Sequence, residues 1–372
     1  MLTPDYLDTF TDPLLKLYEE FQQSIINDIA RRIAKTGGVT ASAAWQLQRI
    51  TESGLVYENA IKEIARLTGK SQTELKKLFT QAGVNAIKFD DSIYKAAGLD
   101  PLPLNLSPAM AEVLAAGLRK TQGVMNNLTL TTAIAAQQQY IHAADLAYMQ
   151  VSSGAMSYDQ AIRAAVKGLA DKGLSVVDYA SGRVDQLDVS VRRAVLTGVQ
   201  QTAGNLQIKR ADEMGSDLVQ TSAHFGSRPT HVEWQGRIFS RSGTHSKYPD
   251  FIISTGYGTV AGLLGANCRH SFYPFFEGIS ENVYNEHMRD ALANKEVTYQ
   301  GQRMSQYDAS QIQRKYERRI RYFKRQKIAL EAAGLDATGE TSKVREYQAL
   351  LRSFVRETGL PRQNVREQVT GQ

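Results

Sequence analysis

Residues 14–33 read LLKLYEEFQQSIINDIARRI, and this stretch decides the fold class. Its large apolar side chains recur at spacings of three and four residues, at Leu14, Tyr18, Phe21, Ile25, Ile29 and Ile33. Because an α-helix has about 3.6 residues per turn, this spacing places all of them on one face. The pattern therefore predicts an amphipathic helix with that face buried, and we expect Gly37 and Gly38 to stop it.

A second helical pattern follows directly. Apolar positions recur along Val56–Leu67, and Gly69 is expected to end this helix. Ser71 and Glu74 have the spacing of a capping box, in which each side chain binds a backbone N–H at the start of a helix. We therefore expect a new helix to begin at Ser71.

Three further helices are predicted before residue 220. Ser107 followed by Pro108 indicates a start, since proline in the first turn loses no helical hydrogen bond. Ser157 and Gln160 repeat the capping-box spacing. A long helix is expected over 188–214, where valine and leucine recur at helical spacing.

The composition changes after residue 220. The stretch 222–278 is rich in glycine and aromatic residues, contains three prolines, and includes the short apolar runs Arg237-Ile-Phe-Ser and Phe251-Ile-Ile-Ser. This pattern is typical of short strands and turns. Helical spacing then returns, with Ile312, Tyr316, Ile320 and Phe323 in one stripe and a last helix over 342–358 that ends at Gly359.

These patterns predict an α+β protein that is mainly helical. In chain order we expect a helical region at 1–98, a stiff Pro-rich connector at 99–108, a second helical region at 109–220, a compact glycine-rich α/β or β-rich module containing His, Cys and Trp at 221–280, and a basic helical tail at 281–372.

Charge is concentrated at one end of the chain. The net charge is +6, and residues 301–372 alone contain 15 Lys or Arg against 8 Asp or Glu. No apolar run is long enough for a membrane span, and the N-terminus lacks the pattern of a secretory signal. The single cysteine, Cys268, excludes an intrachain disulfide and fits assembly in a reducing cytoplasm.

The densest group of metal-ligand types lies in the glycine-rich module. It comprises His224, His231, His245, His270 and Cys268, with Trp234 among them. Cys268 and His270 are two residues apart, so on an extended strand they point to the same side. Thiolate and imidazole together suit zinc, which makes His224, His231, Cys268 and His270 candidate ligands. The spacing matches no recognised zinc finger, so the alternative is that these side chains hydrogen-bond within the core.

Cys268 also raises the question of catalysis, because a histidine can activate a cysteine as a nucleophile. Only Asp250 and Glu233 are near in sequence as acids that could orient the histidine. A lone cysteine is more often a small buried apolar group. We therefore expect no enzymatic activity and no small-molecule substrate.

The tail contains an unusually basic segment. The stretch RKYERRIRYFKRQK, residues 314–327, has eight positive charges and one negative charge, with Arg314, Lys315, Arg318, Arg319, Arg321, Lys324, Arg325 and Lys327 as the cations. Such a helix can bind DNA phosphates without sequence preference. Two other interpretations explain this basic segment equally well. It could bind an acidic protein surface, or it could be the solvated face of a helix that packs through Ile312, Ile320 and Phe323.

Several short sequence motifs in the module occur in a fixed order. They are Ser222-Ala-His-Phe-Gly-Ser-Arg-Pro-Thr-His231, Glu233-Trp-Gln-Gly-Arg-Ile-Phe239, Ser254-Thr-Gly-Tyr-Gly258, Gly265-Ala-Asn-Cys-Arg-His-Ser271 and Pro274-Phe-Phe-Glu-Gly278. In these motifs the chain resembles the phage minor capsid protein 2 family. The resemblance extends to Tyr179-Ala-Ser-Gly-Arg-Val184 and Val191-Arg-Arg-Ala-Val195, and so covers nearly the full length of the chain. The family-motif core comprises Arg228, Trp234, Gly236, Asn267 and Arg269. The Asn267-Cys-Arg word is also similar to the Mu F-like head morphogenesis proteins, where a second cysteine often stands in the place of His270.

The resemblance implies a bacteriophage virion protein. Its members are minor capsid components of low copy number that attach to the portal inside the capsid and act in head morphogenesis, DNA packaging or DNA ejection. The expected partners are the portal protein, the capsid interior and packaged DNA. The expected location is the virion near the portal, after assembly in the host cytoplasm. Two alternatives remain, an enzyme or toxin module that uses Cys268 and the histidines, and a DNA-binding protein that acts through the basic tail.

Overall fold

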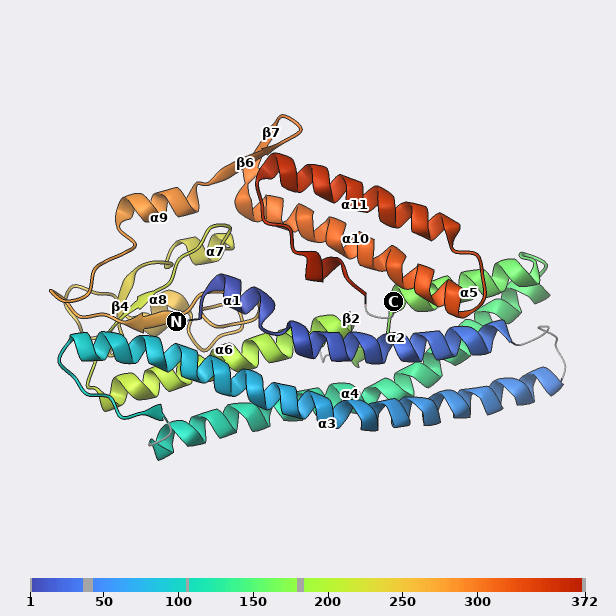
Figure 1. Ribbon diagram of the computed structural model, residues 1–372, viewed down its shortest axis with the longest axis horizontal. Helices are drawn as coiled ribbons and strands as arrows, with labels where there is room; N and C mark the ends of the chain where they lie inside the picture. The colour runs from blue at the N-terminus through green and yellow to red at the C-terminus, as the bar shows by residue number, and fades with distance from the viewer. Residues whose placement is uncertain (1, 36–42, 105–106, 179–183, 370–372) are drawn as a thin grey trace. The chain divides into compact units, whose positions relative to one another are not determined.

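A computed structural model describes residues 2–35, 43–104, 107–178 and 184–369. Helices dominate these ranges, and a few short antiparallel strands accompany them (Figure 1), which confirms the mainly helical α+β class. The helices are α1 (Pro4–Thr9), α2 (Asp12–Ala34), α3 (Ala43–Ala96), α4 (Pro108–Ser152), α5 (Tyr158–Lys172), α6 (Leu187–Glu213), α7 (Pro229–Val232), α8 (Phe251–Thr255), α9 (Glu286–Ala293), α10 (Gln306–Ala332), α11 (Thr338–Thr358) and the 3₁₀ helix η2 (Asn364–Glu367). The strands are β1 (Ser175–Asp178), β2 (Val184–Gln186), β3 (Leu218–Thr221), β4 (Ile238–Ser240), β5 (Phe272–Pro274), β6 (Glu296–Tyr299) and β7 (Gln302–Ser305).

The chain forms two compact units, each assembled from three separate stretches. Unit 1 combines Met1–Asp12, Gln72–Val124 and Arg192–Gln311, and unit 2 combines Pro13–Ser71, Met125–Val191 and Ile312–Gln372. The five-part division expected from the sequence follows chain order instead. The two divisions differ because sequence patterns report neighbours along the chain, whereas a folded unit is defined by contacts between distant segments.

The predicted first helix is confirmed as α2. All six apolar residues of the stripe, Leu14, Tyr18, Phe21, Ile25, Ile29 and Ile33, are buried. The helix ends at Ala34, and the glycines at 37 and 38 lie outside the described residues.

The predicted break at Gly69 is wrong, because α3 continues without interruption from Ala43 to Ala96. Ser71 does not cap a helix, since its hydroxyl donates to the Thr68 carbonyl inside the same helix at 3.0 Å. A glycine within a helix costs only about 1 kcal/mol relative to alanine. Leu67 and Leu75 are both buried on either side of the glycine, and such burial contributes more than the glycine costs.

The predicted helix starts at Ser107 and Ser157 are confirmed. The Met110 backbone N–H donates to the Ser107 hydroxyl at 3.4 Å, where α4 begins. At α5 the Gln160 backbone N–H donates to the Ser157 hydroxyl at 3.3 Å, and the Ser157 N–H donates to Gln160 Oε1 at 3.1 Å. Both partners of the capping box are therefore present.

The described residues of the Pro-rich connector before Pro108 contain no α-helix or strand, and Pro108 is the first residue of α4. The fully buried Arg210 of α6 holds the connector in place, donating to the Leu102 carbonyl at 2.6 Å. The same guanidinium pairs with Asp91 and Glu213, both at 3.0 Å. The positions 105 and 106 lie outside the described residues.

The glycine-rich module in unit 1 is built on a three-stranded sheet with the order β4-β3-β5, both pairs antiparallel. The expected strand at Arg237-Ile-Phe-Ser is β4. The expected strand at Phe251-Ile-Ile-Ser is wrong, because these residues form the short helix α8. Asp250 favours a helix here, because its Oδ1 accepts a hydrogen bond from the Ile253 backbone N–H at 2.6 Å and so caps the N-terminus of α8.

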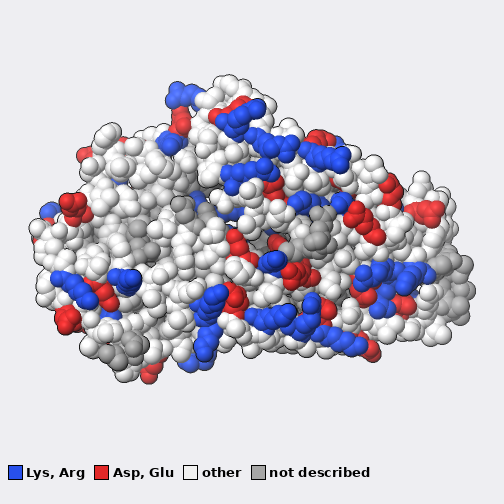
Figure 2. All heavy atoms as spheres, viewed as in Figure 1, with Lys and Arg blue, Asp and Glu red and all other residues white. Residues whose placement is uncertain are grey.

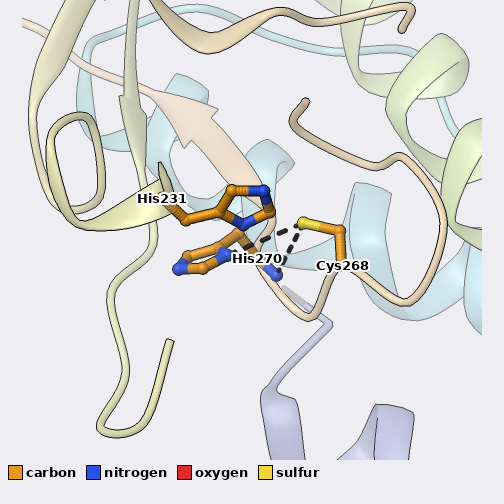
Figure 3. A group of neighbouring side chains, drawn as sticks. All are labelled: His231, Cys268 and His270. Atoms are coloured by element: carbon orange, nitrogen blue, oxygen red, sulfur yellow. Dashed lines mark hydrogen bonds between the residues drawn. The ribbon is translucent and has the colours of Figure 1, made fainter. Parts of the chain in front are cut away.

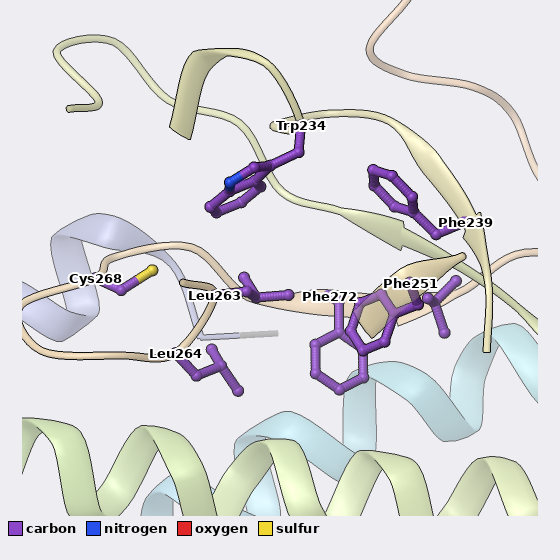
Figure 4. Packing of buried hydrophobic residues seen from close by; sticks show 8 residues of the cluster. Trp234, Phe239, Phe251, Leu263, Leu264, Cys268 and Phe272 are labelled. Atoms are coloured by element: carbon purple, nitrogen blue, oxygen red, sulfur yellow. The ribbon is translucent and has the colours of Figure 1, made fainter. Parts of the chain in front are cut away.

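Strand β3 is the central strand of the sheet, and its residue Val219 belongs to the core of the module. The buried cluster beside it comprises Val219, Trp234, Phe239, Phe251, Leu263, Leu264, Cys268 and Phe272 (Figure 4). The strands are only three or four residues long, so much of the module depends on side-chain packing and turns rather than on a large sheet.

The tail contains an antiparallel hairpin, β6–β7, before α10, which the sequence patterns did not predict. In unit 2, α10 and α11 lie side by side (Figure 1), joined by ring contacts between Tyr316 and Phe354 at 5.8 Å and between Phe323 and Tyr347 at 5.6 Å. Helix α11 begins at Thr338, one turn earlier than expected, and ends before Gly359, whose φ of 70° confirms the predicted stop.

Candidate metal centre

Two segments of the module bring the candidate ligands together. His231 lies on α7, which begins at Pro229 and follows Arg228 in extended conformation. Cys268 and His270 lie on the chain that leads into β5. This approach is turned tightly, since Leu264 and Asn267 both have positive φ, 58° and 57°. Such a conformation is uncommon for residues other than glycine, so the turn is held by its surroundings.

His231, Cys268 and His270 form a compact buried cluster (Figure 3). Their side chains are 2%, 2% and 1% exposed. Cys268 Sγ and one ring nitrogen from each histidine all lie within 4.8 Å of one another. Cys268 Sγ and His270 Nδ1 are 3.6 Å apart. Three residues of the types that bind zinc thus converge on one point.

Hydrogen bonds fix which nitrogen of each histidine faces the cluster. His231 Nε2 lies 2.9 Å from the Ala261 carbonyl oxygen, which can only accept, so Nε2 carries the proton. Gln235 Oε1 accepts from the His224 backbone N–H at 3.3 Å, which identifies that atom as the amide oxygen. His270 Nε2, 3.1 Å from the same oxygen, is therefore also a donor. In both neutral rings Nδ1 keeps its lone pair.

Aromatic rings pack closely around the cluster. The Trp234 ring lies 4.6 Å from the His231 ring and 4.7 Å from the His270 ring, measured between centroids. On the more exposed side, the half-buried His224 stacks on His270 with 4.3 Å between centroids. His224 Nδ1 lies 2.9 Å from the Phe225 carbonyl oxygen, so its Nε2 keeps the lone pair. The fourth expected residue therefore borders the cluster without being part of it.

Burial sets the protonation of the three residues. Desolvation lowers the pKa of His270 well below its ordinary value, with His224 and His231 adding to the effect, and desolvation also lowers the pKa of His231. Both imidazoles are therefore neutral at pH 7, as metal ligands must be. Desolvation raises the pKa of the Cys268 thiol, although the charges of Arg228 and Arg269 act in the opposite direction.

The same geometry is a poor match to an activated nucleophile. A catalytic cysteine needs a lowered thiol pKa and access to substrate, whereas burial raises the pKa of the Cys268 thiol. The far nitrogen of His270 binds the Gln235 amide, not a carboxylate. Of the two acids near in sequence, Asp250 caps α8 and Glu233 is exposed. The arrangement suits metal ligation or a structural hydrogen-bond network better than acyl transfer.

His245 lies elsewhere in the module. Its ring packs on Tyr248 at 5.0 Å between centroids, and its Nδ1 accepts from the Lys247 backbone N–H at 3.2 Å. It therefore belongs to a turn and not to the cluster.

The family-motif residues surround the cluster or shape its backbone. Arg228 donates to the Ala266 carbonyl at 3.0 Å and thereby joins the two ligand-bearing segments. Gly236 has a φ of 69°, and a Cβ at this position would lie 2.7 Å from Tyr284 Cβ. Asn267 provides the positive φ noted above, Trp234 lies against both buried histidines, and Arg269 is half-buried. Most of the motif residues therefore maintain the fold around one site.

Gln235 is the residue that the sequence patterns did not single out. It is 1% exposed and holds His270 in one orientation. The only signal for it was its place in the word Glu233-Trp-Gln-Gly.

The basic segment of α10 does not form one uniform face. Lys315, Arg318 and Arg319 are exposed, and their spacing of three and four residues places them together on the helix. Arg314, Arg321, Lys324 and Lys327 are half-buried, and Arg325 is buried. Lys324 donates to Gln368 and Lys327 pairs with Glu331, at 3.2 and 3.5 Å. On the face drawn in Figure 2, cations gather over α10 and α11 with acidic residues among them.

Comparison with known proteins places these features in a phage context. The family model of phage minor capsid protein 2 matches residues 2–356, which include stretches of both units. A structural protein of Lactococcus phage LL-H is 25% identical over 345 residues, covering 87% of this chain and 88% of that protein. A structural protein of Lactococcus phage mv4 is 39% identical over 130 residues, which are 33% of this chain and 93% of that protein.

No solved structure matches the chain. None of the helices in the described part of the chain combines the length and apolar character that a membrane span needs.

Proposed function

Because the chain belongs to the phage minor capsid protein 2 family and is a structural component of the virion, we propose that it is a low-copy head protein bound to the portal inside the capsid. In this position it acts in head assembly, DNA packaging or DNA ejection. Its proposed partners are the portal protein and the capsid interior, and it reaches them in the host cytoplasm during assembly.

The observation that carries this proposal is the extent of the family match. It covers residues 2–356, so the helical stretches, the module and most of the basic tail all belong to one virion protein. A small enzyme domain attached to an unrelated carrier would match the family over only part of the chain. The structural protein of phage LL-H likewise aligns over 88% of its length.

A second candidate function is contact with packaged DNA through the exposed cations of α10. Lys315, Arg318 and Arg319 lie on one face of the helix and are exposed. Each can neutralise a phosphate without reading the base sequence. Such contacts are compatible with a position at the portal, where DNA enters and leaves the head.

We also propose that the protein has no enzymatic activity. The most reactive side chains of the module, Cys268 and His270, are buried to 2% and 1% exposure. This burial limits contact with a substrate, and the raised pKa of the thiol opposes nucleophilic attack. The burial of Cys268 and His270 and the raised thiol pKa therefore favour the structural proposal over the toxin alternative.

Localisation in assembled heads tests the proposal. A phage that encodes the chain with a small C-terminal tag is purified, labelled with gold against the tag and imaged by electron microscopy after the heads are opened. We expect label at one vertex per head, the vertex that carries the tail. Label distributed over all vertices, or absence of the chain from purified heads, would contradict it.

A phage that lacks the gene separates the three proposed roles. Aberrant or missing heads indicate a role in assembly, and normal but empty heads indicate a role in packaging. Full heads that adsorb to the host without delivering DNA indicate a role in ejection. A fully infectious phage without the chain would exclude all three.

A further inference from the structure

We propose that His231, Cys268 and His270 bind a divalent transition metal, zinc, and that His224 provides the fourth ligand from the more exposed side of the cluster. This metal-site proposal is independent of the proposed location of the protein in the virion. Its three buried ligands come from two chain segments, residues 231 and 268–270, which no disulfide joins.

The spacing of the ligand atoms fits a tetrahedral ion. With zinc–sulfur and zinc–nitrogen bonds of about 2.3 and 2.0–2.1 Å, a tetrahedral site places sulfur and nitrogen about 3.5 Å apart. Cys268 Sγ and His270 Nδ1 are separated by 3.6 Å. The third ligand atom lies within 4.8 Å of both, so it has to move inward by only about 1 Å.

The surrounding hydrogen bonds are those of a metal site. A histidine that binds a metal usually donates its other N–H to a fixed oxygen, which sets the tautomer and orients the ring. His231 does so to the Ala261 carbonyl, and His270 does so to the Gln235 amide oxygen. The Nδ1 lone pairs of both rings are thereby available to a metal bound beside the Cys268 thiol. Neither ring has to give up its hydrogen bond to Ala261 or Gln235.

His224 borders the three buried ligands and is the proposed fourth ligand. Its ring stacks on His270 with 4.3 Å between centroids, and its Nδ1–H is directed to the Phe225 carbonyl at 2.9 Å. Nε2 is therefore its ligand atom. A structural zinc site has four protein ligands, whereas a catalytic site keeps a position open for water. With His224 as the fourth ligand, the proposed site would be closed and structural.

The ligand chemistry selects the metal. One thiolate with three imidazoles suits zinc, while magnesium and calcium prefer oxygen ligands. As the metal–sulfur bond forms, the Cys268 S–H bond breaks and its proton leaves to the solvent. The ion would then connect α7 to the approach of β5 in a module whose strands are three or four residues long. Its binding free energy would add directly to the stability of the module.

Metal analysis of the full chain tests the site. Protein purified from zinc-supplied cells is expected to contain about one zinc per chain. Cys268→Ser and His231→Ala should lose it, whereas His245→Ala, a change in the same module but outside the cluster, should retain it. A wild-type chain that contains no zinc and does not bind it when supplied would overturn the proposal, as would Cys268→Ser with unchanged zinc content.

Cobalt loading of the wild-type chain provides a readout that does not depend on whether the variants fold. The wild-type chain, stripped of zinc and loaded with Co²⁺, should show the strong visible bands of a tetrahedral ion and a near-ultraviolet band from the cobalt–thiolate bond. In His224→Ala the thiolate band should persist while the visible bands change, because water replaces an imidazole. Octahedral cobalt without a thiolate band in the wild type would overturn the site. An unaltered spectrum in His224→Ala would overturn the fourth ligand alone.

Discussion

Gln235 and His270 form a buried hydrogen bond, with 3.1 Å between the amide oxygen of Gln235 and Nε2 of His270. Because the same oxygen accepts from the His224 backbone N–H, its identity as an acceptor is fixed. The bond therefore decides which nitrogen of His270 faces Cys268. One amide thus controls the orientation of a proposed ligand without contacting the metal.

Replacing this amide should weaken the metal site without destroying it. Gln235→Leu removes the outer hydrogen bond of His270, and loss of such a partner typically costs about 10–100-fold in metal affinity. Zinc affinity is measured by competition with a chelating dye. Gln313→Leu is the control, since Gln313 is also a buried glutamine that donates to a carbonyl, that of Pro361, in unit 2. Equal zinc affinity in wild type and Gln235→Leu would contradict a positioning role.

Gly236→Ala should destabilise the module strongly. The position has a φ of 69°, and the added methyl group would lie 2.7 Å from Tyr284 Cβ and 3.3 Å from Ala223 Cβ. A left-handed alanine alone costs about 1 kcal/mol, and the overlap adds about 1–3 kcal/mol. We expect a lower midpoint in urea unfolding. In Gly123→Ala, within α4, the new methyl group meets nothing within 4 Å, so this change should be neutral or stabilising by up to about 1 kcal/mol.

Asp90 should make the stability of the protein dependent on pH. Its fully buried carboxyl receives hydrogen bonds from Gln207 Nε2 at 3.0 and 3.2 Å. Burial raises the pKa of Asp90 from 3.8 to about 8. The folded chain therefore holds this proton more tightly than the unfolded chain does. The contribution of Asp90 to the free energy of unfolding is therefore fully present below pH 3.8. It decreases as the pH rises towards 8 and changes no further above that.

Asp90→Asn removes this dependence and keeps the shape of the side chain. Between pH 5 and 8, the free energy of unfolding of the wild type should fall by at most about 1.4 kcal/mol per pH unit because of this group. The variant should show a shallower fall and exceed the wild type at the alkaline end. Urea unfolding at several pH values provides the comparison. Parallel curves for the two proteins would show that Asp90 does not titrate in this range.

Charge reversal on α10 tests the DNA contact. Lys315→Glu, Arg318→Glu and Arg319→Glu together should abolish most affinity for double-stranded DNA and reduce the slope of log affinity against log salt by about 3, one for each lost phosphate contact. Fluorescence anisotropy with a DNA duplex at a series of salt concentrations measures both quantities.

The matched control lies on α3, where Lys62, Arg66 and Lys70 are also exposed on one face. Reversing these three changes the net charge by the same amount. If both triple variants lose affinity equally, general charge and not the face of α10 explains the binding. If neither loses it, the DNA function is contradicted.

The sequence by itself determined the elements whose cause is local. The stripe of α2, the proline start of α4 and the capping box of α5 each depend on residues within a few positions of one another, and all three formed as predicted. The order of words between residues 222 and 278 likewise sufficed to indicate the family, because it depends on the chain alone.

Tertiary structure decided what depends on contacts between distant residues. Gly69 did not stop α3, because burial on both sides of it outweighs its weak helix propensity. The eight cations of α10 divided into three exposed and five partly or fully buried, since packing selects the face of a helix that meets solvent.

The candidate site needed both levels. The sequence supplied His231, Cys268 and His270 as ligand types, with Cys268 and His270 two positions apart. Only the fold brought the third within 4.8 Å, placed Gln235 behind His270 and left His245 in a separate turn. Residue type fixes which atoms can bind a metal, whereas their convergence depends on turns and packing that join segments far apart in the chain.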